Sequence, residues 1–240
     1  MPKEAIQSYG VIGDGRAAAL VSRGGSIDWL CWPQFDSPSL FAALLDEEKG
    51  GRFSIAPKAR CHVAREYVED TNVLVTRFSA LEGSAALTDL LPIASGAEAA
   101  GQLAPENALL RRLVCDRGDL EVEVRFEPRP EYALAPVRLH DGAHGIRLEL
   151  GAQLYLLRSD APFVIVDGGR AAIARLEMRA GQATDFWLLR ASEGPAVLPP
   201  LGEYARLEID RTVRFWREWI GHCEYDGPYQ EAVRRSALAL

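Results

Sequence analysis

The sequence predicts a mainly β protein: a large antiparallel β-sandwich, or super-sandwich, over residues 1–198, followed by one or two helices within 199–240. Turn-forming residues recur about every eight to twelve positions through the first segment, as in all-β sandwiches and barrels. Apolar and polar residues alternate between the turns, most clearly over 120–127, which is typical of a strand with one solvent-facing side. After Pro199-Pro200 the apolar spacing becomes helical, so 1–198 is predicted as a sandwich domain and 199–240 as a helical linker.

A hairpin near the N-terminus is the first well-defined element. Residues 17–23 and 26–32 predict two strands, because the Gly24-Gly25 pair between them tolerates the positive φ angles of tight turns. Ser37-Pro38 and the apolar residues that follow predict a short N-capped helix over 38–45. A hairpin is therefore expected to lead through a proline-bounded loop into this helix.

The rest of the first segment is predicted as strands joined by short turns. Asp116-Arg117-Gly118-Asp119 gives a strong hairpin signal among those turns, and residues 92–105, rich in Ala, Gly and Glu, predict a loop. The strands expected in this part are 52–56, 61–67, 73–80, 85–91, 109–115, 120–127, 137–140, 146–150, 153–158, 163–166, 170–178 and 182–191.

Two helices are expected at the C-terminal end. Residues 202–221 predict one amphipathic helix of about five turns, and Asp226-Gly227-Pro228 predicts the start of a second. Because the sequence ends on an apolar helical side without a cap or a polar tail, we expect the chain to be a piece of a longer protein. The residues on these sides are Ile209, Val213, Trp216 and Ile220 in the first helix, and Ala232, Val233, Ser236, Ala237 and Leu240 in the second.

Composition and charge argue against several kinds of partner. The net charge is −7 and no basic run stands out, so nucleic acid and anionic membranes are poor partners. No apolar stretch approaches the roughly 18 residues that a membrane helix needs, and the N-terminus lacks the apolar core of a secretion signal. We therefore expect a cytoplasmic location.

The sequence proposes neither a metal site nor a cofactor. Its cysteines and histidines are scattered, and no Cys-x-x-Cys pair occurs. Gly10, Gly13 and Gly15 do not follow the order of a dinucleotide-binding loop, and they precede a predicted hairpin, so they are interpreted as tight-turn glycines. The residues considered are Cys31, Cys61, Cys115, Cys223, His62, His140, His144 and His222.

Two sets of side chains could contact a sugar in principle. An inverting glycosidase needs two carboxyls about 6.5–9.5 Å apart across a cleft, whereas most carboxylates of a globular protein are simply solvated. Aromatic rings can stack on pyranose faces, although most tryptophans pack in cores or between domains. The carboxylates are Asp28, Asp36, Asp89, Glu131, Glu224 and Asp226, and the tryptophans are Trp29, Trp32, Trp187, Trp216 and Trp219.

Two motifs resemble one known family. Tyr9-Gly10-Val11-Ile12-Gly13-Asp14-Gly15-Arg16, followed by SRGGSIDWLCWPQFDSPSLFAALLD, resembles the opening of bacterial glycoside hydrolase family 15 proteins, which are glucoamylase-like and trehalase-like enzymes. Cys223-Glu224-Tyr225-Asp226-Gly227-Pro228-Tyr229, followed by EAVRRSALAL, resembles the start of the helical catalytic barrel of that family. The resemblance extends over the whole chain in order.

The resemblance implies an N-terminal β-sandwich joined by a helical linker to an (α/α)6 barrel. It further implies hydrolysis of α-linked glucosides with inversion, with one glutamate as general acid and another activating water. Both glutamates belong to the barrel, and this chain stops at the first barrel helix, so no catalytic residue is assigned here. The implied partners are the barrel and, in the intact enzyme, an α-glucoside.

Two groups of residues are expected to face that barrel. The loop of Trp32, Gln34, Phe35 and Asp36 mixes aromatic and polar side chains between two prolines, and we expect it to border the substrate cleft. Trp216, Trp219, Ile220 and Tyr229 are expected to pack between the domains. The alternative for the loop is that Trp32 and Phe35 pack on the helix over 38–45, while Asp36 stabilises the N-terminus of that helix.

Other functions remain open for the chain. It could be a free-standing carbohydrate-binding or scaffold module, or a sandwich whose role is dimerisation. An uncovered apolar surface at the C-terminal end would also favour self-association of this piece of the protein.

Overall fold

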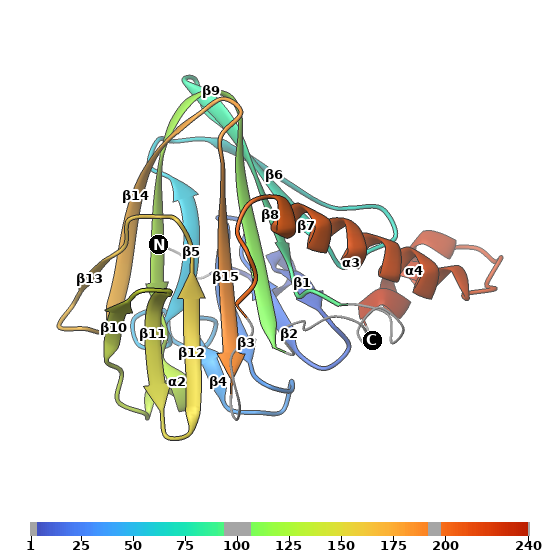
Figure 1. Ribbon diagram of the computed structural model, residues 1–240. Helices are drawn as coiled ribbons and strands as arrows, with labels where there is room; N and C mark the ends of the chain where they lie inside the picture. The colour runs from blue at the N-terminus through green and yellow to red at the C-terminus, as the bar shows by residue number, and fades with distance from the viewer. Residues whose placement is uncertain (1–3, 94–106, 192–197, 240) are drawn as a thin grey trace.

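The computed structural model describes residues 4–93, 107–191 and 198–239, and the described part is mainly β. Fifteen strands form one continuous antiparallel sheet, and the helices follow at the C-terminal end (Figure 1). This confirms the predicted fold class. The predicted boundary between two domains at residues 198–199 stays a prediction.

The sheet divides into two layers that share strand β9. One layer contains β1 to β5, β13 and β14, and the other contains β6 to β8, β10 to β12 and β15. The strands are β1 Gly10–Gly13, β2 Ala18–Val21, β3 Ser26–Cys31, β4 Ser39–Phe41, β5 Arg52–Pro57, β6 His62–Tyr67, β7 Leu74–Ser79, β8 Gly83–Leu90, β9 Ala108–Glu127, β10 Leu139–Gly142, β11 Gly145–Leu150, β12 Gln153–Arg158, β13 Val164–Val166, β14 Ala171–Arg179 and β15 Ala183–Ala191.

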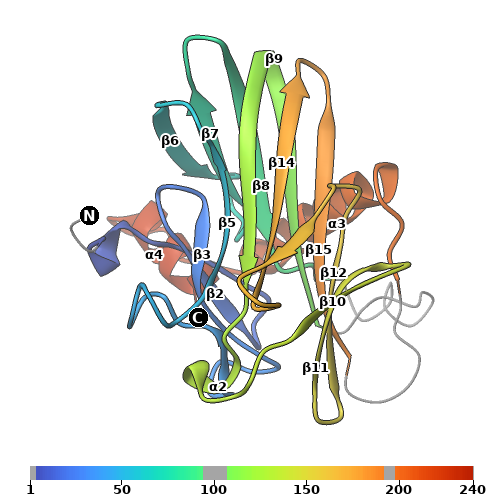
Figure 2. The same ribbon diagram turned by 90° about the vertical axis from the view of Figure 1, so that its left-hand side faces the viewer.

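Strand β9 shows that the hairpin predicted at 116–119 is wrong. The chain continues as one strand of 20 residues that bends over near its middle, with β8 and β15 beside its first half and β5 and β14 beside its second (Figure 2). Asp116 is an extra residue in the pairing with β8, a β-bulge, and Gly118 has a φ of +64°. A Cβ at Gly118 would lie 1.9 Å from the carbonyl oxygen of Glu82. The turn-forming residues therefore bend a continuous strand from one layer into the other.

The core between the two layers is aromatic near its centre and contains one buried ion pair. Phe53 makes edge-to-face contacts with Phe126 and Phe186 at centroid distances of 5.6 and 6.3 Å. Arg111 and Asp89 are both fully buried, and the guanidinium also donates to the carbonyl oxygens of Phe53 and Gly25. Burial of the Arg111 charge without partners would cost free energy, but here hydrogen-bond acceptors surround its guanidinium.

The predicted helix over 38–45 is wrong. The first part of this segment is β4, whose Phe41 pairs with Leu30 of β3. Its backbone also forms hydrogen bonds to other segments, because the carbonyl oxygen of Leu40 accepts from the amide of Arg129. Leu40 and Phe41 are both buried, which requires apolar surroundings on both sides of the segment, as a strand inside the sandwich has. Strand pairing and burial override the proline-capped helical pattern here.

Two short helical turns lie elsewhere in the β region. The 3-10 turn η1 is Ile6–Ser8, and α2 is Pro130–Ala133. In α2 the residues after the proline have positive φ angles, so the turn is left-handed, and it packs on β4.

Helices α3 (Glu203–Gly221) and α4 (Gln230–Ala239) confirm the two predicted C-terminal helices. The first half of α3 covers the outer face of the layer that contains β15, where Ala205 packs with Trp187 and Leu110. The second half extends past the sheet towards α4 (Figure 1). Asp185 accepts hydrogen bonds from the Gly202 amide at 2.7 Å and from Arg112, and so anchors the start of α3 on the sheet.

The predicted apolar side of α4 is only partly correct. Leu238 is buried and Ala237 is half-buried, but Ala232 and Ser236 are exposed, and Leu240 lies outside the described residues. Arginines on the neighbouring positions of the helix face the sheet instead, as described below. The predicted loop over 92–105 also lies outside the described residues beyond position 93.

Candidate functional site

The glycines near the N-terminus form the turn between β1 and β2. Asp14 accepts hydrogen bonds from the amides of Arg16 and Ala17 at 2.9 and 2.8 Å, which closes the turn, and Gly15 supplies the positive φ angle of +81°. The amide of Phe35 donates to the carbonyl oxygen of Arg16 at 2.9 Å. The β1–β2 turn and the loop after β3 are thereby held side by side.

The four predicted rim residues separate into two groups. Trp32 is 2% exposed and packs in the core, whereas Gln34, Phe35 and Asp36 are exposed, Phe35 by 74%. The Ser37 hydroxyl accepts from the Gln34 amide at 3.1 Å, which keeps the loop turned. The rim role therefore stays a prediction for the three exposed residues, and Trp32 supports the loop from beneath.

The predicted interdomain residues lie at the far end of α3 and on the chain after it. Trp216 and Ile220 are buried and pack with Leu238 of α4, so their interdomain role stays a prediction. Trp219 is 43% exposed and lies edge-to-face with Trp216 at a centroid distance of 5.8 Å. Tyr229 is 84% exposed, so nothing in the described part of the chain covers it.

A cavity of about 380 Å³ joins these two predicted groups, and we name it the helix–hairpin hollow. It lies between the β1–β2 turn, the loop after β3 and the two C-terminal helices. Phe35, Trp216 and Trp219 all contribute to its wall, which neither motif could show on its own. The hollow is lined by Val11, Gly13, Asp14, Gly15, Arg16, Ala17, Ala18, Phe35, Asn72, Ile93, Phe215, Trp216, Trp219, Ala237, Leu238 and Ala239.

Helix α4 is fixed to the sheet beside this hollow by the turn between β6 and β7. The guanidinium of Arg234 donates to both carboxylate oxygens of Asp70 at 3.1 and 2.7 Å. This pairing raises the pKa of Arg234, with the hydrogen bond to Asp70 as the largest cause. Asp70 has a φ of +60°, which is an uncommon angle for a residue other than glycine.

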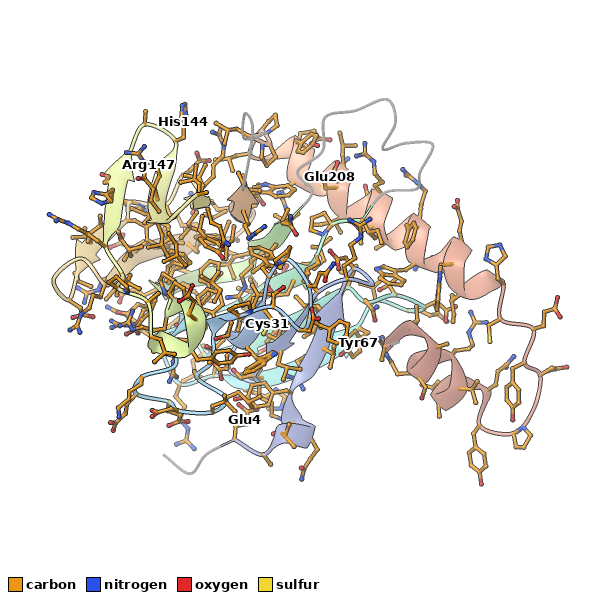
Figure 3. The ribbon with its side chains drawn as sticks, turned by 90° about the horizontal axis from the view of Figure 1, so that it is seen from below. Glu4, Cys31, Tyr67, His144, Arg147 and Glu208 are labelled. Atoms are coloured by element: carbon orange, nitrogen blue, oxygen red, sulfur yellow. The ribbon has the colours of Figure 1, made fainter. Side chains whose placement is uncertain are left out.

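A second arginine completes the attachment of α4. Arg235 donates to the carbonyl oxygen of Thr71 at 2.7 Å and to the side chain of Asn72, and its guanidinium lies over the Tyr67 ring, 4.1 Å from the centroid. Figure 3 shows Tyr67 at the junction of the sheet and α4. Asn72 in turn donates to the carbonyl oxygen of Leu238. We refer to these contacts, with the Arg234–Asp70 pair, as the turn clamp.

The sequence did not reveal the turn clamp. Arg234 and Asp70 are separated by 164 positions, and neither lies in a motif with a known spacing. The local signal is the Glu69-Asp70-Thr71-Asn72 cluster, which is typical of a turn but does not indicate a partner.

The candidate carboxylates have different surroundings. Asp89 is paired with Arg111 in the core, and buried Asp28 accepts hydrogen bonds from the hydroxyls of Tyr9 and Ser26. Burial and the bond to Asp28 raise the pKa of Tyr9. Asp36, Glu131, Glu224 and Asp226 are exposed. The two buried carboxylates therefore stabilise the fold, and the chemistry of the site is that of an apolar, aromatic contact surface.

The described residues do not gather metal-ligating side chains at one place. Over 4–93, 107–191 and 198–239, no group of three or more His, Cys, Asp or Glu side chains is placed to hold a metal ion. The four cysteines are free thiols, and burial raises the pKa of Cys31 and of Cys115. Among the described helices, none is long and apolar enough to cross a membrane.

Fold and site together define a two-layer antiparallel β-domain that carries two docked helices and an aromatic hollow at their junction. The chain belongs to the family described as "Trehalase-like, N-terminal", which matches residues 2–205. Helix α3 begins just before the end of this match, so most of the hollow's helical wall lies beyond it.

Relatives in sequence are trehalases, and a relative in structure is a glucoamylase. The chain is 31% identical over 242 residues to the trehalase of Thermoplasma volcanium, and 32% identical over 205 residues to trehalase 1 of Sulfolobus acidocaldarius. These alignments cover 98% and 76% of the chain but only 37% and 34% of the relatives, so the chain spans little more than a third of their length. The crystal structure of a bacterial glucoamylase complexed with acarbose has a TM-score of 0.59 at 9% identity, over 90% of this chain and 37% of that one.

Proposed function

We propose that the chain is the non-catalytic N-terminal domain of a family 15 glycoside hydrolase that cleaves α-linked glucosides with inversion. The main support is the alignment of 98% of the chain with 37% of a trehalase, which leaves most of that enzyme outside the match. The exposed aromatic surface at the C-terminal helices fits a domain that packs against another. Catalysis then belongs to the part of the protein that follows residue 240, in an (α/α)6 barrel.

This proposal is tested by comparing the hydrolytic activity of a shorter and a longer form of the protein. The chain 1–240 and a protein that continues to the length of the trehalase relatives would be incubated with trehalose, maltose and maltodextrin. The longer protein is expected to release glucose with inverted anomeric configuration, because its two carboxyls act across one cleft. The chain 1–240 is expected to show no saturable turnover, since the described part places no such pair across its hollow. Hydrolysis by purified 1–240 that is lost on mutating one of its own carboxylates would contradict the proposal.

We assign Gln34, Phe35 and Asp36 to the edge of the substrate cleft in the longer protein. Their exposure, and the hydrogen bonds that keep the loop turned, support this assignment. Asp36→Asn should lower kcat/KM about tenfold at an unchanged melting temperature. Glu48→Gln, an exposed carboxylate after β4, is the control and should leave both values unchanged. An Asp36→Asn variant with wild-type kinetics would end the assignment.

A free-standing carbohydrate-binding module is the second candidate, because the hollow exposes aromatic side chains. Isothermal titration of 1–240 with trehalose and maltose separates the two: saturable binding without a longer protein favours the module.

We place the protein in the cytoplasm, which its four free thiols support.

A further inference from the structure

We propose that the helix–hairpin hollow is the docking surface for the part of the protein that follows α4, with Phe35 and Trp219 as its apolar anchors and Arg16 as its charged contact. This inference rests on the proposed function, because it requires a following domain. It adds which residues hold that domain against the β-sandwich, and it places Phe35 where the docked domain meets the edge of the substrate cleft.

The hollow has the properties of an unfilled contact surface. Its volume of about 380 Å³ would be filled by roughly a dozen waters at about 30 Å³ each. Aromatic side chains form much of its wall, and two of them are left open, Phe35 at 74% and Trp219 at 43%. Large aromatic residues around a pocket are the usual anchors of protein interfaces. Burial of both would remove apolar area from water that the described chain leaves exposed.

The position of α4 identifies the occupant. Ala237, Leu238 and Ala239, the last described residues, form part of the wall, so any residues that follow emerge beside the hollow. The turn clamp fixes this end of α4 through Asn72, which itself lines the hollow. A following domain therefore begins within contact distance, and it would reach the hollow without a long linker.

Charge defines the rim of the docking surface. Arg16 is exposed, and no ion pair to its guanidinium is found in the described part of the chain. The neighbouring Asp14 accepts from the two backbone amides of the turn through Oδ1. The hollow therefore presents apolar walls, and Arg16 supplies the positive charge at its rim. The segment that docks there should carry apolar side chains with a carboxylate beside them.

Hydroxyl-radical footprinting tests the proposal without any measurement of activity. In the chain 1–240, Phe35 and Trp219 should both be labelled, as should Leu81, which is 98% exposed at the turn between β7 and β8. In the longer protein, Phe35 and Trp219 should lose most of their labelling while Leu81 keeps it. Equal labelling of Phe35 and Trp219 in both proteins would overturn the proposal.

The same measurement separates the other occupants. Protection in 1–240 that disappears on dilution would assign the hollow to a second copy of the chain, and protection that needs added trehalose or maltose would assign it to a sugar. Either result overturns the proposal. If the longer protein hydrolyses none of the glucosides but still protects Phe35 and Trp219, the proposed function fails while the docking surface stands.

Variants give an independent measurement. Phe35→Ala should leave the unfolding midpoint of 1–240 nearly unchanged, because its side chain is mostly exposed there, and should lower the midpoint of the longer protein. Arg16→Glu should act in the same way through repulsion of the facing carboxylate. Leu81→Ala is the matched control and should affect neither protein. A Phe35→Ala longer protein with the wild-type midpoint would contradict the role of Phe35 as an anchor.

Discussion

The core and the helical end of this molecule each contain an arginine that donates two hydrogen bonds to an aspartate. Arg111 donates through Nε and Nη2 to Asp89 at 2.7 and 3.2 Å, and Arg234 donates through the same atoms to Asp70 at 3.1 and 2.7 Å. The geometry is nearly the same, but the surroundings are not. The side chains of the first pair are 0% exposed, and those of the second are 25% and 35% exposed.

The comparison shows that burial, more than geometry, decides what such a pair does. In the core, loss of either partner would leave the other as an unpaired charge away from water. Breaking this pair therefore has a large cost in free energy. At the turn clamp, water can replace either partner, so the Arg234–Asp70 contact can open at a smaller cost. The core pair therefore stabilises the fold through its burial, whereas the clamp pair acts together with the contacts of Arg235 and Asn72.

Removal of the buried carboxylate should have the largest effect. Asp89→Asn leaves the charge of Arg111 in the core, and we expect the free energy of unfolding to fall by about 3–5 kcal/mol. Urea unfolding followed by circular dichroism measures this loss. Glu66→Gln removes a carboxylate that pairs with Arg77 at the surface, at 63% and 52% exposure, and serves as the control. If both variants unfold at the same urea concentration, the contrast between the two environments is wrong.

Alkaline pH should weaken the core by a smaller amount. Burial raises the pKa of Cys31 and of Cys115 above the usual value of 9.0, so the unfolded chain releases these protons at a lower pH than the folded chain. Stability is therefore fully present below pH 9 and should fall as the pH rises through it. Urea midpoints on both sides of this pH test the expectation. A Cys31→Ala/Cys115→Ala variant should show a shallower fall, and an unchanged slope would argue against these thiols as the cause.

Opening of the turn clamp should have the smallest and most local effect. Arg234→Gln should leave the urea midpoint of 1–240 close to the wild-type value, because the pair is partly exposed. It should still accelerate proteolysis within 222–239, because α4 then separates from the sheet more often. Glu231→Gln, on the exposed side of the same helix, is the control. If Arg234→Gln and Glu231→Gln are cut equally fast, the clamp does not retain α4.

The strands could be predicted because their turns carry local chemistry. Gly25, with a φ of +78°, joins β2 to β3 where the Gly24-Gly25 pair predicted a hairpin, and Gly168 and Gly169 do the same between β13 and β14. Such signals depend only on neighbouring residues, so the sequence alone is enough to detect them.

The errors occurred where partners distant in sequence decide the local structure. The four residues 116–119 suit a hairpin or a bulge equally well, and only the simultaneous pairing of β9 with β8 and β15 selects the bulge. The segment 38–45 has a helical pattern, but its first part pairs with β3 and so becomes a strand of the sheet. Nothing near Arg234 and Arg235 in the sequence indicates that the turn at 68–73 supplies their acceptors. Of the four residues expected at the cleft rim, Gln34, Phe35 and Asp36 are exposed, whereas Trp32 is buried.

Strand β9 also affects when the sheet can be completed during synthesis of the protein. Two of its neighbours, β5 and β8, leave the ribosome before it, but β14 and β15 follow only after five further strands or turns have been made. Until then the longest strand of the sandwich presents unpaired backbone along one edge in each half, and such an edge invites pairing with another chain. We therefore expect a nascent chain that stalls before β15 to expose this edge, and the two layers can close around β9 only after β15 has been translated.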